Sequence, residues 1–165
     1  MQEHSQYQVN SDVLYFAPRD DLQVEYQIPV QGLSRVQISS IPAQSWSSDK
    51  KVLIVDDQEF NIRAIEIIMR YQLKLDMDKI QIDEALSGAR ALDLLKADIE
   101  ANQNQHCSYQ VIFMDCQMPF MDGYQCTERI RALLASKDIK QPLILAVTGH
   151  NEQAYINRCI NAGMN

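Results

Sequence analysis

An apolar run that ends in an acidic residue is the feature that most constrains how this chain can fold. The run Val111–Met114 consists of β-forming residues and predicts a buried strand, and Asp115 follows it directly. A proline and then the pair Asp122-Gly123 predict a loop. Asp115 is therefore expected at the carboxyl end of a strand. Ligands bind at that edge of open parallel sheets, so this carboxylate is a candidate for metal binding, nucleophilic attack, or both.

From Lys51 onward, strand-like and helix-like segments alternate along the chain. Short apolar or alternating runs indicate strands, and apolar residues at helical spacing indicate the helices between them. Strands are predicted at residues 52–55, 80–85, 111–114 and 143–147, and helices at 60–71, 89–99, 124–134 and 152–162, the last one capped by Gly163. Successive strand–helix units predict an α/β fold with a doubly wound parallel sheet.

The composition argues against two classes of partner. A net charge of −7, with only 15 Lys and Arg residues, disfavours a nucleic-acid interface because phosphate binding needs clustered basic side chains. No stretch approaches the roughly 18 consecutive apolar residues of a membrane span, so no membrane contact is expected from this segment. The four cysteines lack metal-binding spacing and are expected to be reduced thiols, as in a cytoplasmic protein.

Residues 1–49 are predicted to form an irregular tail or linker ahead of a domain at 50–165. Val24–Ile28 alternates like a half-buried strand and forms, with Arg35–Ile38, a candidate β-hairpin. Pro29 interrupts this pattern, because a proline cannot donate a hydrogen bond to a neighbouring strand.

Polar functional residues follow three of the four predicted strands. Asp56 and Asp57 follow the first strand, Asp115 the third and Thr148 the fourth. If the first and third strands are neighbours, three carboxylates share one crevice, and a cation or protonation must relieve their repulsion. Carboxylate oxygens suit Mg²⁺, and a phosphoryl group fits beside such an ion. Asp115 is then the candidate nucleophile, and the Thr148 hydroxyl could donate to a phosphoryl oxygen.

Each of these residues also has a simpler interpretation. A single Asp at a strand end is usually a helix cap or a turn former, and Thr148 alone could be a capping hydroxyl. The combination of three strand ends favours the functional interpretation. In the loop after Asp115, we interpret Met118, Phe120 and Met121 as residues that pack within the loop. Cys116 is interpreted as a small buried filler.

The motifs at these strand ends resemble response-regulator receiver domains of two-component and phosphorelay systems. The resemblance covers about residues 50–165 and rests on the run Val55-Asp56-Asp57, the block 114–123 and the run Ala146-Val147-Thr148, in that order. Within this family, Asn61 and the sequence of residues 114–123 are most similar to the receivers of hybrid sensor histidine kinases. The resemblance implies a flavodoxin-like fold with strand order 2-1-3-4, in which the family's fifth strand and last helix are missing.

The resemblance also implies roles at the acidic site. Asp115 would be the phosphoacceptor, and a phosphohistidine of a histidine kinase or of a histidine phosphotransfer protein would supply the phosphoryl group. Asp115 and Asp57 would bind Mg²⁺ directly, whereas Asp56 would act through a metal-bound water. The backbone carbonyl of Gln117 would be the remaining protein ligand. The chain would thus be a regulatory phosphoacceptor domain without a kinase catalytic domain.

Two further roles concern the response to phosphorylation. Thr148 matches the family's switch residue, which moves toward the phosphoryl group. Gln117 and His150 occupy positions whose side chains tune the lifetime of the phosphate in the family. The conserved-type Lys of the family has no counterpart up to Asn165, so the site would lack its main fixed cation.

The missing elements predict a C-terminally truncated receiver. The resemblance to hybrid kinases implies that it is cytoplasmic, as the cytoplasmic part of a membrane-anchored sensor kinase. The fourth strand would be an exposed apolar edge, and the isolated chain is expected to be poorly stable. The alternative function is a degenerate receiver that acts as a non-phosphorylated protein-interaction module. A phosphatase that forms an aspartyl phosphate is disfavoured, because Gln117 stands where a second Asp would act as general acid.

Overall fold

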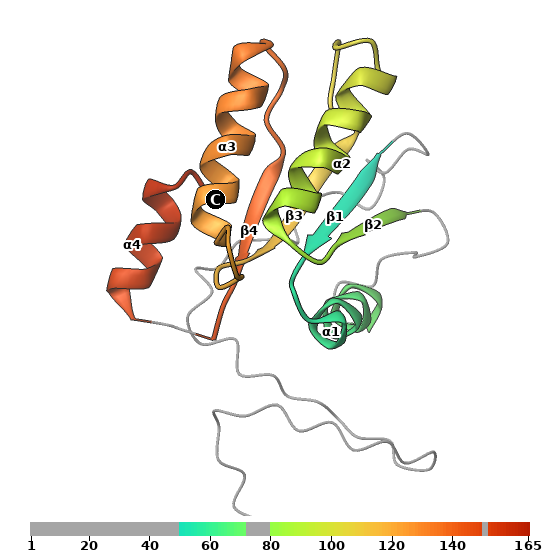
Figure 1. The fold of residues 1–165 in the computed structure, drawn as a ribbon. Helices are drawn as coiled ribbons and strands as arrows, with labels where there is room; N and C mark the ends of the chain where they lie inside the picture. The colour runs from blue at the N-terminus through green and yellow to red at the C-terminus, as the bar shows by residue number, and fades with distance from the viewer. Residues whose placement is uncertain (1–49, 72–79, 150–151) are drawn as a thin grey trace, which may run out of the picture. The chain divides into compact units, whose positions relative to one another are not determined.

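The computed structural model describes residues 50–71, 80–149 and 152–165, so the predictions for residues 1–49 and for His150 lie outside the described residues. Within these ranges, four parallel strands form one sheet in the order β2-β1-β3-β4 (Figure 1). The elements are β1 (Lys51–Val55), α1 (Glu59–Tyr71), β2 (Gln81–Ala85), α2 (Gly88–Ala101), β3 (Tyr109–Asp115), α3 (Gly123–Ser136), β4 (Leu143–Val147) and α4 (Gln153–Asn161). The predicted doubly wound α/β sheet and its strand order are confirmed.

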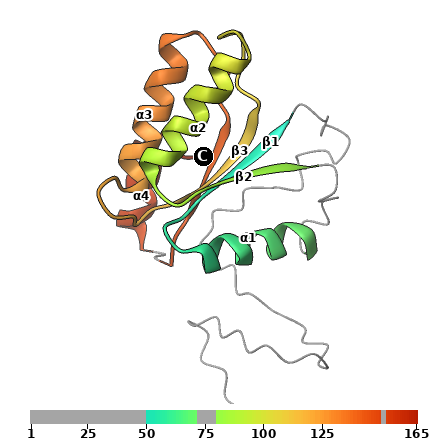
Figure 2. The same cartoon turned by 45° about the vertical axis from the view of Figure 1, so that its right-hand side comes forward.

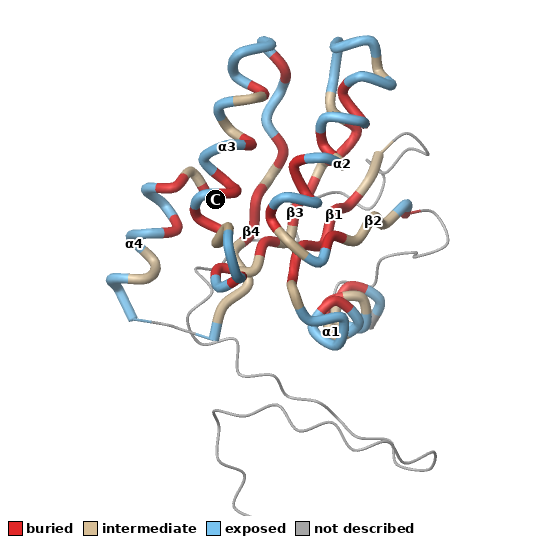
Figure 3. The backbone as a smooth tube through the Cα atoms, viewed as in Figure 1, coloured by how far each residue is buried: buried red, intermediate tan, exposed pale blue. Residues whose placement is uncertain are grey.

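Helices cover both faces of the sheet, and this explains the apolar character of the strands. Figure 2 shows α1 on one face and α2 with α3 on the other. Side chains of β1 alternate between the two cores: Leu53 and Val55 pack with residues of α2, α3 and α4, while Val52 and Ile54 pack with residues of α1. Figure 3 shows the resulting buried residues along the central strands and the inner sides of the helices.

Two residues set how the chain leaves β3 and enters α3. The Asp122 side chain accepts a hydrogen bond of 2.8 Å from the backbone N–H of Gln125 and caps α3. Gly123 follows, and a Cβ atom there would lie 2.0 Å from the carbonyl oxygen of Asp115. Only glycine therefore allows the start of α3 to approach the end of β3 so closely.

The end of α4 returns to β4. Gly163 has φ 93° and ends the helix, with Met164 N–H donating to the Cys159 carbonyl, so the predicted Gly163 cap is confirmed. Asn165 then donates its backbone N–H to the carbonyl of Ile144, and the Ile144 N–H donates to the Asn165 side chain, both at 2.9 Å. Part of the β4 edge is thus hydrogen-bonded; the low stability expected from that edge stays a prediction.

None of the helices in the described ranges is long and apolar enough to cross a membrane.

Candidate functional site

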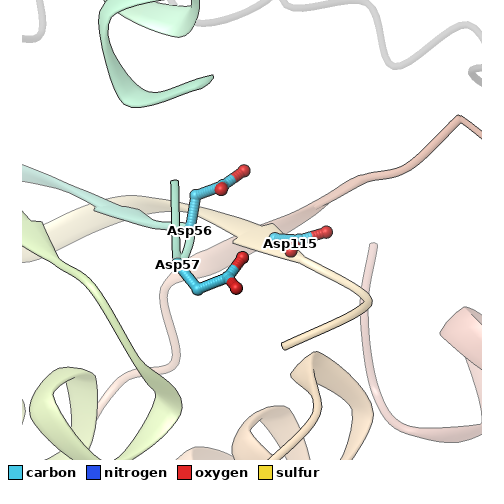
Figure 4. Close-up of side chains that lie close together, drawn as sticks. All are labelled: Asp56, Asp57 and Asp115. Carbon is cyan, nitrogen blue, oxygen red and sulfur yellow. The ribbon is translucent and has the colours of Figure 1, made fainter. Parts of the chain in front are cut away.

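Three acidic side chains meet at the carboxyl edge of the sheet. Asp56 and Asp57 follow β1, Asp115 ends β3, and these two strands are hydrogen-bonded neighbours. Each side chain offers a carboxylate oxygen, and these oxygens lie within 4.8 Å of one another (Figure 4). Asp56 is buried, with 1% of its surface exposed, whereas Asp57 and Asp115 are half-buried. The predicted convergence of the three carboxylates is therefore found in the structure.

The buried carboxylate of Asp56 is held in place by the start of α1. Its Oδ1 accepts the backbone N–H of Gln58 at 2.9 Å and the side-chain amide of Asn61 at 3.1 Å. The side chain of Gln58 donates to Oδ2 of Asp57 at 3.2 Å. The loop after β1 thus orients both acids toward the end of β3.

Asp115 is fixed by the loop that it begins. Its Oδ1 accepts the backbone N–H of Gln117 at 3.1 Å. The next residue, Cys116, donates its N–H to the carbonyl of Val147, and its own carbonyl accepts the N–H of Gly123. The phosphoacceptor candidate therefore lies where β3, β4 and the start of α3 are joined by backbone hydrogen bonds.

The electrostatics of the site favour the binding of a cation. Burial raises the pKa of Asp56, and the charge of Asp57 raises it further. Burial also raises the pKa of Asp115, the Gln117 N–H lowers it, and the charges of Asp56 and Asp57 raise it again. Among the ion pairs of the described residues, none joins a Lys or Arg to these three acids. Their mutual repulsion is left for a bound cation or protons to relieve.

The donor set fits Mg²⁺. All three side chains offer hard carboxylate oxygens that lie within 4.8 Å of one another. Gln117 is exposed in the loop after β3, and its role as a backbone ligand stays a prediction. Thr148 directly follows Val147, which is the register partner of Asp115, so the structure puts the predicted switch residue beside the acidic group.

Sequence reasoning missed the contacts that hold α4 against this edge. Arg158 forms an ion pair of 2.9 Å with Asp122 and lies 3.9 Å from the centroid of the Tyr124 ring. Next to it, the sulfur of Cys159 lies 3.8 Å from that of Cys116. Asp122 and Arg158 are 36 positions apart, and no sequence pattern links them. Asn61 was noted for its resemblance to hybrid-kinase receivers, but nothing in the sequence indicated its bond to Asp56.

One prediction about the same loop was wrong. Met118 is buried and packs as expected, but Phe120 has a relative exposure of 106%. The Met121 N–H donates to the carbonyl of Pro119 at 2.8 Å, which forms a tight turn with Phe120 at its tip. This turn carries the Phe120 ring away from the protein.

Comparison with known proteins agrees with the fold. The family model of the response regulator receiver domain matches residues 52–165. Among curated relatives, probable histidine kinase 2 of Oryza sativa subsp. indica is 41% identical over 88 residues, which cover 50% of this chain and 8% of that protein. Histidine kinase CKI1 of Arabidopsis thaliana is 35% identical over 120 residues, covering 70% of this chain and 10% of the kinase. The chain thus spans about a tenth or less of these relatives.

Two solved structures extend the comparison. The receiver domain of Arabidopsis CKI1, complexed with Mg²⁺ and BeF₃⁻, is 31% identical with a TM-score of 0.59, covering 74% of this chain and 80% of that one. The co-crystal structure of the Saccharomyces cerevisiae phosphotransfer protein Ypd1 with the receiver domain of Ssk1 gives 25% identity and a TM-score of 0.56, covering 70% and 74%. With its matching sheet and clustered acids, the chain belongs to the response regulator receiver domain family.

Proposed function

We propose that this chain takes part in phosphorelay signalling by accepting a phosphoryl group on Asp115 in a Mg²⁺-dependent reaction. The observation that carries the proposal is the convergence of Asp56, Asp57 and Asp115 within 4.8 Å. An oxygen of Asp115 attacks the phosphorus atom, the bond from phosphorus to the donor nitrogen breaks, and the donor imidazole leaves with the electron pair of that bond.

The proposed site residues have separate roles in binding and orientation. Asp57 and Asp115 would hold Mg²⁺ directly, Asp56 would act through water, and the carbonyl of Gln117 would add a fourth protein oxygen. The bound ion supplies positive charge that neutralises the acids and the phosphoryl oxygens together. Thr148 would donate its hydroxyl to a phosphoryl oxygen, and Gln117 with His150 would tune the lifetime of the phosphate. The CKI1 receiver solved with Mg²⁺ and BeF₃⁻ supports this assignment.

The donor is proposed to be the phosphohistidine of a histidine kinase or of a histidine phosphotransfer protein, met in the cytoplasm. The support is the co-crystal structure of Ypd1 with a similar receiver. The alternative of a receiver that only docks to other proteins is less well supported, because a docking module has no need for three clustered acids whose charges oppose one another.

The direct test is labelling with phosphoramidate, a small donor whose phosphorus–nitrogen bond resembles that of phosphohistidine. We expect an acid-labile, Mg²⁺-dependent phosphate on the chain and none on Asp115→Asn. Asp93→Asn is the matched control, because Asp93 is an exposed acid on α2. Absence of label on the unaltered chain, together with absence of Mg²⁺ binding, would support the docking module instead.

A further inference from the structure

Two buried cysteine thiols are in contact beside the acidic site. The sulfur of Cys116 lies 3.8 Å from the sulfur of Cys159, and either thiol can donate a weak hydrogen bond to the other. Cys116 directly follows Asp115, whereas Cys159 lies on α4, 43 positions further along the chain. Both cysteines are free. A disulfide needs its sulfurs about 2.0 Å apart, so a small movement would join α4 to the residue after the phosphoacceptor candidate.

Cys116 is the fixed member of the pair. Its backbone N–H donates to the carbonyl of Val147 at 3.1 Å, and its carbonyl accepts the N–H of Gly123 at 3.3 Å, so it is held between β4 and the start of α3. Only 1% of its surface is exposed. Burial, together with the contact with Cys159, raises the pKa of the Cys116 thiol to about 12. Because the thiolate is the nucleophile, Cys116 does not begin an oxidation reaction.

Cys159 is the movable member of the pair. Its helix, α4, is nine residues long, and no side chain caps its start. Arg158 joins α4 to the start of α3 through an ion pair with Asp122, and this pair is partly exposed and contributes little stability. Cys159 is 8% exposed and stands between two exposed residues of α4. Local opening of such a short helix admits a small oxidant to Cys159 and allows the shift of roughly 2 Å that a disulfide requires.

A buried tyrosine hydroxyl lies beside the thiol pair. Tyr124 is 4% exposed, and its hydroxyl has no hydrogen-bond partner among the described residues. Against the raising effect of burial, this hydroxyl lowers the pKa of the Cys116 thiol, so it lies close to that sulfur. A phenolic O–H is a hydrogen-bond donor. The surroundings of the two sulfurs therefore contain a donor that can stabilise negative charge on a thiolate.

We propose that Cys116 and Cys159 form a modification site, which hydrogen peroxide converts into a reversible disulfide that pins α4 to the end of β3. The Cys159 thiolate attacks one oxygen of the peroxide, the O–O bond breaks, and the released hydroxide takes up the thiol proton and leaves as water. Cys116 then attacks the sulfur of the resulting sulfenic acid, the S–O bond breaks, and hydroxide leaves with the Cys116 proton as a second water. Both sulfurs are oxidised and the peroxide is reduced. The disulfide goes beyond the proposed function and does not depend on phosphorylation of Asp115.

The test uses the full 165-residue chain, which is first reduced and then exposed to hydrogen peroxide. We expect the chain to lose two of its four thiols, counted after denaturation, and a non-reducing digest to contain one linked pair of peptides that hold Cys116 and Cys159. Dithiothreitol should restore all four thiols, because a disulfide is reversible and a sulfinic acid is not. Hydrogen exchange in α4 should slow by about tenfold or more in the oxidised chain, since the disulfide opposes local opening.

Two variants serve as comparisons. Cys159→Ala is expected to keep its three remaining thiols and to show the same hydrogen exchange in α4 with and without peroxide. Cys107→Ala is the matched control, because Cys107 is a half-buried cysteine that precedes β3, at the opposite edge of the sheet. This variant should form the disulfide between Cys116 and Cys159 and slow the exchange in α4 as the unaltered chain does.

Four results would overturn the inference. The first is retention of all four thiols at peroxide concentrations that oxidise free cysteine in the same solution. The second is a disulfide through Cys107 between two copies of the chain, in place of the one between Cys116 and Cys159. The third is formation of the expected disulfide without any slowing of hydrogen exchange in α4. The last is an equal slowing in peroxide-treated Cys159→Ala, which would show that the disulfide is not its cause.

Discussion

The side-chain amide of Asn61 donates a hydrogen bond of 3.1 Å to Oδ1 of Asp56. The bond joins the first turn of α1 to a carboxylate that is almost completely buried. Because the backbone N–H of Gln58 donates to the same oxygen, the carboxylate is fixed from two sides. Asn61 therefore supports the acidic site without belonging to it.

Removing this support is expected to weaken metal binding. Asn61→Ala leaves Asp56 with one of its two donors, so its carboxylate is less well oriented and its raised pKa is raised further. Partners of this kind typically contribute about a tenfold or larger factor to metal affinity, and we expect a loss of about tenfold for Mg²⁺ in a calorimetric titration. Gln105→Ala is the control, because Gln105 is an exposed amide between α2 and β3, at the opposite edge of the sheet. A similar loss in both variants would contradict the specific role of Asn61.

Gly123 is expected to be indispensable for the fold. In Gly123→Ala the new Cβ would meet the Asp115 carbonyl at 2.0 Å, and a backbone atom cannot move aside without shifting β3 or α3. We expect a loss of about 3 kcal/mol or more in the free energy of unfolding, measured by urea denaturation. Gly149→Ala is the matched control, since nothing lies within 4 Å of a Cβ there. Equal stability of the two variants would show that the approach of α3 to β3 is not tight.

The sequence predicted β1, β3 and β4 well because these strands are largely buried and appear as apolar runs. The predicted bounds of β4 are those observed, and β3 is longer than predicted by Tyr109, Gln110 and Asp115. The meeting of the three acids also followed from the sequence, since the carboxyl ends of neighbouring parallel strands lie at one edge. Local patterns therefore sufficed for the elements and for the acids that follow them.

Contacts between distant segments could not be predicted in this way. The ion pair between Arg158 and Asp122 depends on how α4 packs against the start of α3. The spacing of residues in the sequence does not indicate this packing. The exposure of Phe120 was missed for a related reason. Its apolar character predicted packing, whereas the turn from Pro119 to Met121 directs it outward.

The Arg158 contacts are expected to hold α4 in place with modest strength. Its ion pair with Asp122 is partly exposed, with side-chain exposures of 57% and 26%, and such pairs contribute about 0.5 kcal/mol. Stacking on the Tyr124 ring adds a similar amount. Arg158→Ala should therefore lower the free energy of unfolding by about 1 kcal/mol and speed hydrogen exchange in α4. Arg158→Lys should recover only part of the loss, because a lysine lacks the planar group that stacks on the ring; full recovery would contradict the stacking.

The acidic site should make the stability of the chain depend on pH and Mg²⁺ in a definite sense. The pKa of Asp115 is raised in the folded chain, so this carboxyl binds more protons there than in the unfolded chain over the interval between the two pKa values. Without metal, its contribution to stability is favourable at low pH and is lost as the pH rises through the raised value. Asp115→Asn, which carries no charge, should accordingly be more stable than the unaltered chain at pH 7 and lose that advantage toward pH 4. If Mg²⁺ binds the ionised acids as proposed, it should stabilise the unaltered chain at pH 7 and have little effect on the variant. The free energy of unfolding is measured by urea denaturation at pH 7 and pH 4, with and without Mg²⁺. If the unaltered chain without Mg²⁺ were more stable than Asp115→Asn at pH 7, this would contradict the repulsion inferred for the three acids.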